Sequence, residues 1–271
     1  MKELTVIVPI HTYDEEVAKY LDDAFTSYVL ANNFLNLKDK DDEISPIVFV
    51  GPSDVLNKLD EIEKIKEWPN KSYIINDDNT TFSAQINKAV SLINSKYFSI
   101  LEFDDMYTKK WFHNFAKYLN EYKDVSIFLP ITEVYDEKNK ENGPLMFINE
   151  AVWASSFSEE LGFLDLESLE NFGNFNLTGA IFNTEDYLSV GGLKESMKFS
   201  FWYEFIMRMA HNSKKMYVIP KVGYKHLLNR PYSISNMYNT TMTSDEVDWW
   251  IELAHKEYFF KKDRNKTYDG D

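Results

Sequence analysis

The segment Tyr97–Asp105 (YFSILEFDD) is an apolar run that ends in three carboxylates within four positions. A short apolar run bounded by polar residues is typical of a strand buried in a sheet. Acids that directly follow such a strand stand at its carboxyl edge, where open α/β sheets bind their ligands. Crowded carboxylates repel one another unless a cation lies among them, and a divalent cation bridging phosphate oxygens would fit. The alternative is a polar loop whose acids are simply solvated.

The part of the chain before this segment alternates between predicted strands and helices. Leu4–Ile10 is an uninterrupted apolar run rich in β-branched residues, which is typical of a parallel strand buried on both faces. The predicted strands cover residues 4–10, 44–50, 73–75 and 97–101, and the predicted helices cover residues 14–30, 56–65 and 81–94. This alternation predicts an α/β fold, in which helices flank a mostly parallel sheet connected by right-handed crossovers.

The rest of the chain has a less regular pattern. Helices are predicted at residues 111–122, 201–211 and 245–260, and strands at residues 125–131, 178–182 and 216–219. Residues 136–144 are charged turn material, and residues 145–175 mix aromatic and acidic residues without a clear period. The last helix predicts a C-terminal helical extension, whose aromatic residues cover either the core or a partner surface.

The composition narrows the classes of function. With 271 residues, 44% of them apolar, the chain can bury a large core, and without cysteine it can form neither disulfides nor thiolate metal sites. A net charge of −15 disfavours binding to nucleic acid. The lysines near the end are expected on a solvated face, with a local basic groove as the alternative, formed by Lys214, Lys215, Lys221, Lys225 and Arg230. Because no membrane span or secretion signal is recognisable, we expect a cytoplasmic protein.

Six segments resemble, in the correct order, the motifs of family 2-like glycosyltransferases with the GT-A fold. They are Val8–Tyr13 (VPIHTY), Asn79–Ala89 (NTTFSAQINKA), Leu101–Asp105 (LEFDD), Tyr187–Glu195 (YLSVGGLKE), Tyr203–Arg208 (YEFIMR) and the closing strand Met216–Pro220 with Tyr224–His226. The third of these resembles the metal-binding DxD motif, with a glutamate in place of the first aspartate. The resemblance implies a GT-A fold, here a Rossmann-like α/β sheet.

The resemblance also implies an activity and a domain division. It implies a metal-dependent glycosyltransferase that moves a sugar from a nucleotide-diphosphate donor, most simply a UDP-sugar, to a hydroxyl of a carbohydrate or another acceptor, with inversion. The catalytic domain is expected over residues 1–235, with a nucleotide-sugar half at 1–105 and an acceptor half at 106–235, followed by the helical extension at 236–271.

The resemblance carries over to particular residues. Those it implies for binding the nucleotide sugar are Pro9, His11, Tyr13, Asp78, Ser83, Asn87, Glu102 and Asp104. The metal ligands it implies are Asp104, Asp105 and His226, and such a set suits Mn²⁺ or Mg²⁺. Plainer alternatives exist, since Pro9 can simply end a strand, Asn79 can cap a helix, and His226 can pack in a hydrogen-bonded core.

The expected catalytic helix departs from the family pattern. The usual acidic pair falls on Phe201 and Trp202, and the nearest acid is Glu204. Because an inverting transfer needs a carboxylate as general base, Glu204 is predicted to be catalytic. Alternatively, Glu204 pairs with Arg208, four residues later on the same helix face. Other acids that could reach the cleft are Asp165, Glu167 and Glu170.

The acceptor is expected against residues 145–180, which offer flat aromatic faces and polar groups. These are Trp153, Phe157, Phe163, Phe172 and Phe175, with Asn174, Asn176 and Thr178. The alternative is that most of these aromatic residues belong to the core.

Two other functions fit part of the pattern. A sugar-nucleotide nucleotidyltransferase would share the sheet and the acids, but it needs a basic, glycine-rich loop where this chain has Pro9–Tyr13 (PIHTY). A catalytically inactive GT-A-fold module that binds a sugar or a nucleotide sugar is the main alternative, because the acidic pair of the catalytic helix is missing.

Overall fold

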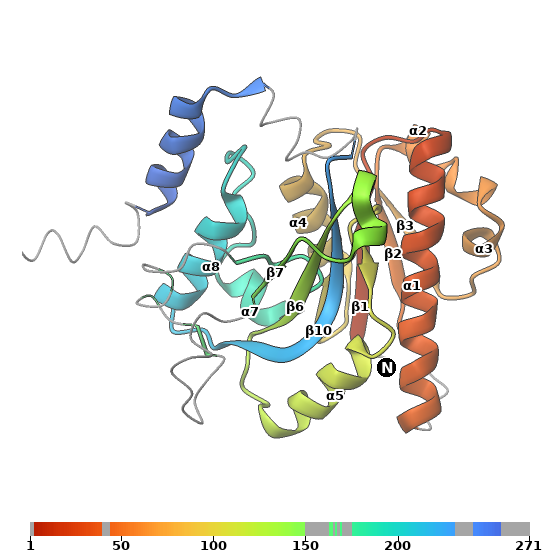
Figure 1. Cartoon of the computed structure of the whole chain (residues 1–271), viewed down its shortest axis with the longest axis horizontal. Coiled ribbons are helices and arrows are strands. Elements are labelled where there is room, and N and C mark those ends of the chain that lie inside the picture. The colour runs from red at the N-terminus through yellow and green to blue at the C-terminus, as the bar shows by residue number, and fades with distance from the viewer. Residues whose placement is uncertain are drawn as a thin grey trace, which may run out of the picture.

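One sheet organises the protein (Figure 1). The computed structural model describes residues 3–39, 44–149, 163–164, 166, 169, 175–230 and 241–255. The strands of the sheet are β1 (Leu4–Pro9), β2 (Ile47–Gly51), β3 (Lys71–Ile75), β4 (Tyr97–Ile100), β5 (Met106–Tyr107), β6 (Ile127–Asp136), β7 (Met146–Ile148), β8 (Phe163–Leu164), β9 (Ile181–Asn183) and β10 (Met216–Leu228). Their order is β3-β2-β1-β4-β9-β6-β10-β5, with β7 paired to β6 and β8 to β10.

The first half of the sheet is parallel, as the sequence predicts. β3, β2, β1 and β4 run in the same direction, and every residue of β1, β2 and β4 is buried. Beyond β4 the sheet becomes mixed, because β9 is antiparallel to both β4 and β6, whereas β10 is parallel to β6. The carboxyl ends of β1 and β4 therefore meet at one edge, where the acids that follow β4 begin.

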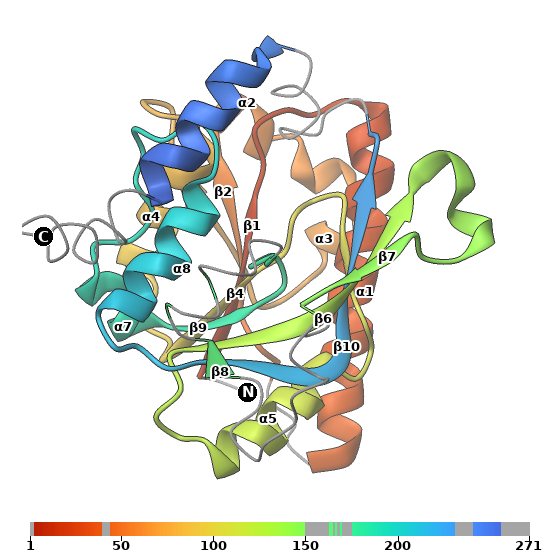
Figure 2. The same cartoon turned by 60° about the vertical axis from the view of Figure 1, so that its left-hand side comes forward.

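Helices cover both faces of this sheet (Figure 2). They are α1 (Glu15–Asp39), α2 (Ser53–Leu56), α3 (Glu63–Lys66), α4 (Phe82–Leu92), α5 (Trp111–Glu121), α7 (Thr184–Ser189), α8 (Phe201–His211) and the 3₁₀ turns η1 (Leu59–Glu61) and η2 (Glu137–Asn142). A further helix spans residues 244–255. α1 and α5 pack on one apolar cluster, and α4, α7 and α8 pack on the other, which also includes Ala254. None of the described helices is long and apolar enough to cross a membrane.

Local capping explains where the two helices nearest the candidate site begin. Asp14 accepts hydrogen bonds from the backbone N–H groups of Glu16 and Val17, both at 2.9 Å, so α1 starts directly after it. For α4 the cap is Thr81, which accepts from the N–H of Ala84 at 3.4 Å. Asn79 lies two residues earlier and accepts a hydrogen bond from the N–H of Thr81 at 3.1 Å, so the alternative that Asn79 is the cap is wrong.

Several elements differ from the predicted ones, and three of the differences have a clear physical reason or form. α1 continues well beyond residue 30, because Ala31 and Leu35 extend its buried face. The predicted helix over residues 56–65 is divided among short turns. β10 does not end at Ile219, because its pairing with β6 shifts register between Val218 and Val222, and this bulge accommodates Pro220, which lacks an N–H to donate.

Gly179 allows β10 to pass close beneath the acids that follow β4. Its φ of +72° is a left-handed conformation, and a Cβ there would lie 2.2 Å from the ring of Tyr224. Its carbonyl oxygen accepts a hydrogen bond from the indole N–H of Trp111 at 2.9 Å. Gly179→Ala is expected to lower the free energy of unfolding by about 3 kcal/mol, through overpacking and backbone strain together.

The matched control is Gly143→Ala, since Gly143 has a φ of +90° and no atom within 4 Å of the added Cβ. Only backbone strain acts there, because a φ of +90° with a ψ of −178° is essentially restricted to glycine, and this strain costs about 2 kcal/mol. Urea denaturation of both variants measures the difference. Equal losses of unfolding free energy in the two variants would show that the Tyr224 ring moves aside without destabilising the protein.

Candidate active site

The turn Glu102–Asp105, hereafter the acid turn, connects β4 to β5 at the carboxyl edge of the sheet. Its backbone is held by the N–H of Asp105, which donates to the carbonyl of Glu102 at 3.1 Å. The N–H of Glu102 donates to the hydroxyl of Tyr224 on β10 at 3.1 Å. Carboxylate oxygens of Glu102, Asp104 and Asp105 lie within 4.8 Å of one another, so the turn presents its three acids to one point.

Asp105 fastens the acid turn to the end of β10. It is fully buried, and its Oδ1 accepts a hydrogen bond from the N–H of Leu227 at 3.0 Å. Its Oδ2 lies 2.8 Å from Nδ1 of His226. Nη2 of Arg230 is 3.4 Å from the same Oδ1. Both oxygens of this carboxylate therefore already have partners within the protein.

Asp104 keeps one oxygen without such a partner. Its side chain is almost completely buried, and its Oδ2 forms an ion pair with Nη1 of Arg230. Its Oδ1 is buried and has no hydrogen-bond partner among the described residues. A buried carboxylate oxygen left in this way requires an explanation, and a bound ligand is one. Glu102 is half-buried beside it.

Charges around the acid turn shift several pKa values. Burial, with the charge of Asp105, raises the pKa of Glu102 to about 7. For His226, burial opposes the charged form, but Asp105 and Glu102 raise the pKa to about 9. Burial lowers the pKa of Arg230 to about 10, which leaves its guanidinium charged at neutral pH. Two cations, His226 and Arg230, therefore face the three acids of the turn.

The donor set fits a hard divalent cation. Oxygen ligands from carboxylates suit Mg²⁺ and Mn²⁺, a carboxylate oxygen of Asp104 lies within 4.8 Å of one of Glu102, and Asp104 has an unbonded Oδ1. A cation at this position would also favour the charged form of Glu102, against the effect of burial. Asp104 and Glu102 are therefore the residues best placed to hold a metal ion.

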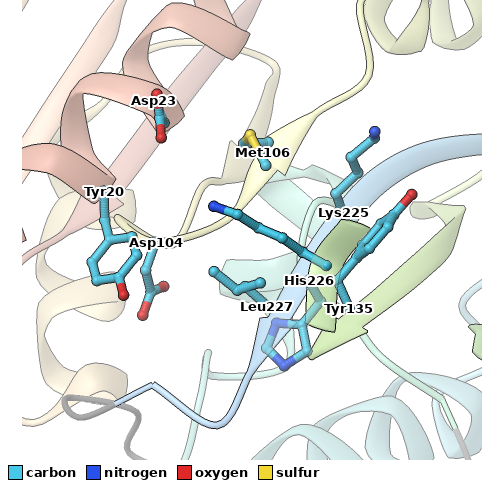
Figure 3. A pocket seen from close by; sticks show the side chains of 9 residues that line it. Tyr20, Asp23, Asp104, Met106, Tyr135, Lys225, His226 and Leu227 are labelled. Atoms are coloured by element: carbon cyan, nitrogen blue, oxygen red, sulfur yellow. The ribbon is translucent and has the colours of Figure 1, made fainter. Parts of the chain in front are cut away.

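A cavity of about 220 Å³ lies beside the acid turn (Figure 3). Asp104 and His226 line it together with residues of α1, β5, β6, η2 and β10, namely Tyr20, Asp23, Met106, Tyr135, Lys140, Lys225 and Leu227. The hydroxyl of Tyr20 donates a hydrogen bond to Glu137, which ties η2 to α1. Tyrosine rings and lysines therefore line the cavity together with Asp104 and His226.

The end of β1 reaches the acid turn through His11. Pro9 is the last residue of β1 and is buried, and the ring of His11 meets Phe103 edge-on with centroids 5.7 Å apart. Burial lowers the pKa of His11, so its imidazole is neutral at neutral pH. Tyr13 turns toward α2 and η1, with the ammonium of Lys58 5.9 Å from its ring centroid. His11 is thus in contact with the acid turn through Phe103, whereas Tyr13 contacts Lys58.

The predicted residues near α4 have different surroundings. Asp78 is exposed, and Ser83 is buried in the first turn of α4. The amide of Asn87 donates to the carbonyl of Leu193 at 2.8 Å and accepts from its N–H at 2.9 Å. Asn87 therefore fastens the Gly191–Gly192 turn to α4, and its predicted contact with a nucleotide stays a prediction.

Gln85 is a residue that the sequence analysis missed. Its side-chain amide donates to the carbonyl oxygens of Ile10 at 3.3 Å and Thr80 at 3.2 Å, and the residue is buried. It joins the end of β1 to the start of α4, which are the two segments expected to bind the nucleotide. A buried glutamine on an apolar helix face is the signal that could have identified it.

The comparisons with known proteins agree with this geometry. The family model for glycosyl transferase family 2 matches residues 5–180, which is most of the chain. The chain belongs to glycosyl transferase family 2. Among curated protein sequences none matches this family 2 chain.

Solved structures confirm the GT-A fold of this family 2 protein. S. aureus TarS, residues 1–349, matches in complex with UDP-GlcNAc at a TM-score of 0.67 and 16% identity, over 94% of this chain and 65% of that one. The UDP complex of the same protein matches at a TM-score of 0.61 and 16% identity, over 96% of this chain and 72% of that one. The mannosyltransferase PcManGT from Pyrobaculum calidifontis, in complex with GDP-Man and Mn²⁺, matches at a TM-score of 0.56 and 13% identity, over 85% of this chain and 58% of that one. The chain spans about two thirds of the length of the first of these structures.

In this family 2 protein, Glu204 lies in a strongly cationic environment on α8. The residue is fully buried, and its carboxylate bonds to Nε of Arg208 at 3.0 Å and to Nη2 at 2.8 Å. Nζ of Lys194 is 3.0 Å from the same carboxylate. The pairing with Arg208 that the sequence offered as an alternative is therefore present, and the assignment of Glu204 as general base stays a prediction.

The two aromatic residues at the position of the family's acidic pair belong to a cluster. Phe201 and Trp202 pack on Phe82, with ring centroids 5.6 Å and 5.7 Å apart, and Trp202 also stacks on Phe182 at 6.1 Å. The first turn of α8 thus contributes apolar surface where the family pattern has carboxylates.

The predicted acceptor surface is only partly described. Asn176 accepts hydrogen bonds from the N–H and the hydroxyl of Thr178, at 2.8 Å and 2.6 Å. It also donates its own N–H to Asn149 at 3.0 Å. Phe175 is partly buried against the apolar cluster on which α4, α7 and α8 pack. The remaining predicted residues or their side chains lie outside the described residues, namely Trp153, Phe157, Phe163, Asp165, Glu167, Glu170, Phe172 and Asn174.

Proposed function

We propose that this protein is a metal-dependent glycosyltransferase that moves a sugar from a nucleotide-diphosphate donor to an acceptor hydroxyl, with inversion. The observation that carries the proposal is the acid turn, where an almost completely buried Asp104 keeps one oxygen without a partner. Membership of family 2 supports the reaction class. The UDP-GlcNAc and GDP-Man complexes of the similar folds support a nucleotide sugar as donor, with a UDP-sugar as the first candidate.

The proposed roles follow from the contacts around the acid turn. Asp104 and Glu102 would hold Mn²⁺ or Mg²⁺, which neutralises the charge that develops on a leaving diphosphate. Asp105 and His226, predicted as further ligands, would orient the turn, since they already bond to each other at 2.8 Å. Pro9, His11 and Tyr13 would line the nucleotide end of the same cleft, with Asp78 and Ser83 across from them.

Binding of the donor is testable without knowledge of the acceptor. With Mn²⁺ present, the matching nucleoside diphosphate is expected to raise the melting temperature by about 5 °C or more at saturating concentration. A panel of UDP, GDP, ADP and CDP, measured by thermal shift with and without Mn²⁺, checks this. Asp104→Asn is the control, and it should lose the Mn²⁺-dependent part of the shift. A panel without any such shift would contradict the proposal.

One observation favours a second function, a binding module that does not turn over its ligand. The acids expected on α8 are replaced by Phe201 and Trp202, and the carboxylate of Glu204 is neutralised by Arg208 and Lys194. Such a module would give the same thermal shift. It would not release a free nucleoside diphosphate from a nucleotide sugar, and this separates the two functions.

A further inference from the structure

Arg230 is a buried cation built into the acid turn. Only 2% of its surface is exposed, although in the sequence it is one of several basic residues near the end. Its guanidinium pairs with Asp104 through Nη1 and approaches Asp105 through Nη2 at 3.4 Å. Its Nε donates a hydrogen bond to the carbonyl of Leu227. These contacts hold the positive charge against the same carboxylate that would bind a metal ion.

The position of this charge bears on how the acid turn would accept a second cation. Arg230 uses Oδ2 of Asp104 and leaves Oδ1, so the two cations would share one carboxylate. Like charges at such short range, away from bulk water, repel strongly. A diphosphate would bring negative charge to the same place and offset this repulsion, because it offers oxygens to the metal ion and to the guanidinium alike.

We propose that Arg230 makes divalent-cation binding at the acid turn depend on a bound diphosphate. Without the diphosphate the guanidinium competes with the metal ion for Asp104, and with the diphosphate the two cations no longer oppose each other. The inference rests on the proposed function, since it assumes that Asp104 is a metal ligand. It adds a residue that determines the order in which metal and nucleotide bind.

Neighbouring basic side chains are poorer candidates for this role. Lys225 lies on β10, shortly before Arg230 in the chain, but its side chain is 39% exposed and its ammonium is 3.7 Å from Glu133. Its charge is therefore screened by solvent and directed at a different acid. Lys225→Met is thus a matched control, since it removes one positive charge beside the same cavity without touching Asp104.

Mn²⁺ binding to the whole chain, followed by the electron paramagnetic resonance signal of free Mn²⁺, tests the proposal with UDP as the probe. In the unsubstituted protein, UDP is expected to tighten Mn²⁺ binding by at least about tenfold. In Arg230→Met, Mn²⁺ should bind without UDP at least about tenfold more tightly than in the unsubstituted protein. Arg230→Lys keeps the charge and should bind Mn²⁺ weakly without UDP. Lys225→Met should bind Mn²⁺ as the unsubstituted protein does.

Two results would overturn the proposal. One is an Arg230→Met variant with a native circular dichroism spectrum that binds Mn²⁺ no more tightly without UDP. The other needs no variant, namely an unsubstituted protein that binds Mn²⁺ equally well with and without UDP. If Asp104→Asn still abolishes Mn²⁺ binding in either case, the proposed function stands and only the role of Arg230 fails. If no Mn²⁺ binds under any condition, both the proposed metal site and the proposed role of Arg230 are wrong.

Discussion

Asp104→Asn is expected to lower the Mn²⁺-dependent release of nucleoside diphosphate from a nucleotide sugar by about a hundredfold or more. The substitution keeps the shape of the side chain but replaces a charged carboxylate, whose Oδ1 is buried without a partner, by a neutral amide. Because a hard cation prefers charged oxygen ligands, the amide binds it more weakly. Initial rates measured over a range of Mn²⁺ concentrations check this, and added Mn²⁺ should not restore the maximal rate.

The matched control for this prediction is Asp124→Asn. Asp124 is an exposed acid that pairs with Lys215 at the surface, so its loss should leave the rate unchanged. Chelation of divalent cations should lower the rate of the unsubstituted protein to that of Asp104→Asn and have little effect on the variant itself. A variant as active as the unsubstituted protein would show that the acid turn takes no part in the reaction.

Glu204→Gln is expected to lower the free energy of unfolding by about 3 kcal/mol or more. The carboxylate is completely buried and is bonded to both Arg208 and Lys194. A glutamine would leave the partly buried guanidinium of Arg208 without its counter-ion, and an uncompensated charge is costly away from water. Urea denaturation followed by circular dichroism measures the loss directly.

The same variant separates the two roles considered for Glu204. A general base that is not needed for stability would give a large fall in turnover with an unchanged urea midpoint. An ion-paired structural residue gives the reverse, with a lowered midpoint and turnover that recovers at a temperature where the variant is folded. Glu185→Gln, at an exposed position of α7, is the control and should change neither quantity.

Most of the fold is predictable from the sequence because its signals are local. The apolar runs of β1, β2 and β4 are visible without any knowledge of their neighbours, and α8 begins and ends at the residues that the helical spacing indicates. The resemblance to family 2 glycosyltransferases and the GT-A fold are both confirmed. The errors occur where tertiary packing overrides a local signal, as at Pro220, whose bulge keeps β10 in the sheet.

The candidate site is less predictable, because its decisive contacts join distant parts of the chain. Asp105 meets His226 and Arg230, which lie 121 and 125 positions away. In the sequence Arg230 is one basic residue among several, and nothing local distinguishes it from a solvated lysine. The bonds of Asn87 to Leu193, 106 positions later, are likewise invisible in the sequence. Motifs identified the acid turn, but only the tertiary contacts show which of its oxygens are already used.

The wide separation between the acids and their anchors has a consequence for how the protein folds. The consecutive strands β1 and β2, and β2 and β3, pair through single crossovers, whereas the bonds from Asp105 to the end of β10 close a loop of more than 120 residues. Closing a loop of that length costs more chain entropy than closing the shorter ones, so we expect these contacts to form after the local ones. During synthesis the carboxylates leave the ribosome long before their cations do. Ligand affinity at the acid turn is therefore acquired late, and it reports that the chain has reached its complete native state.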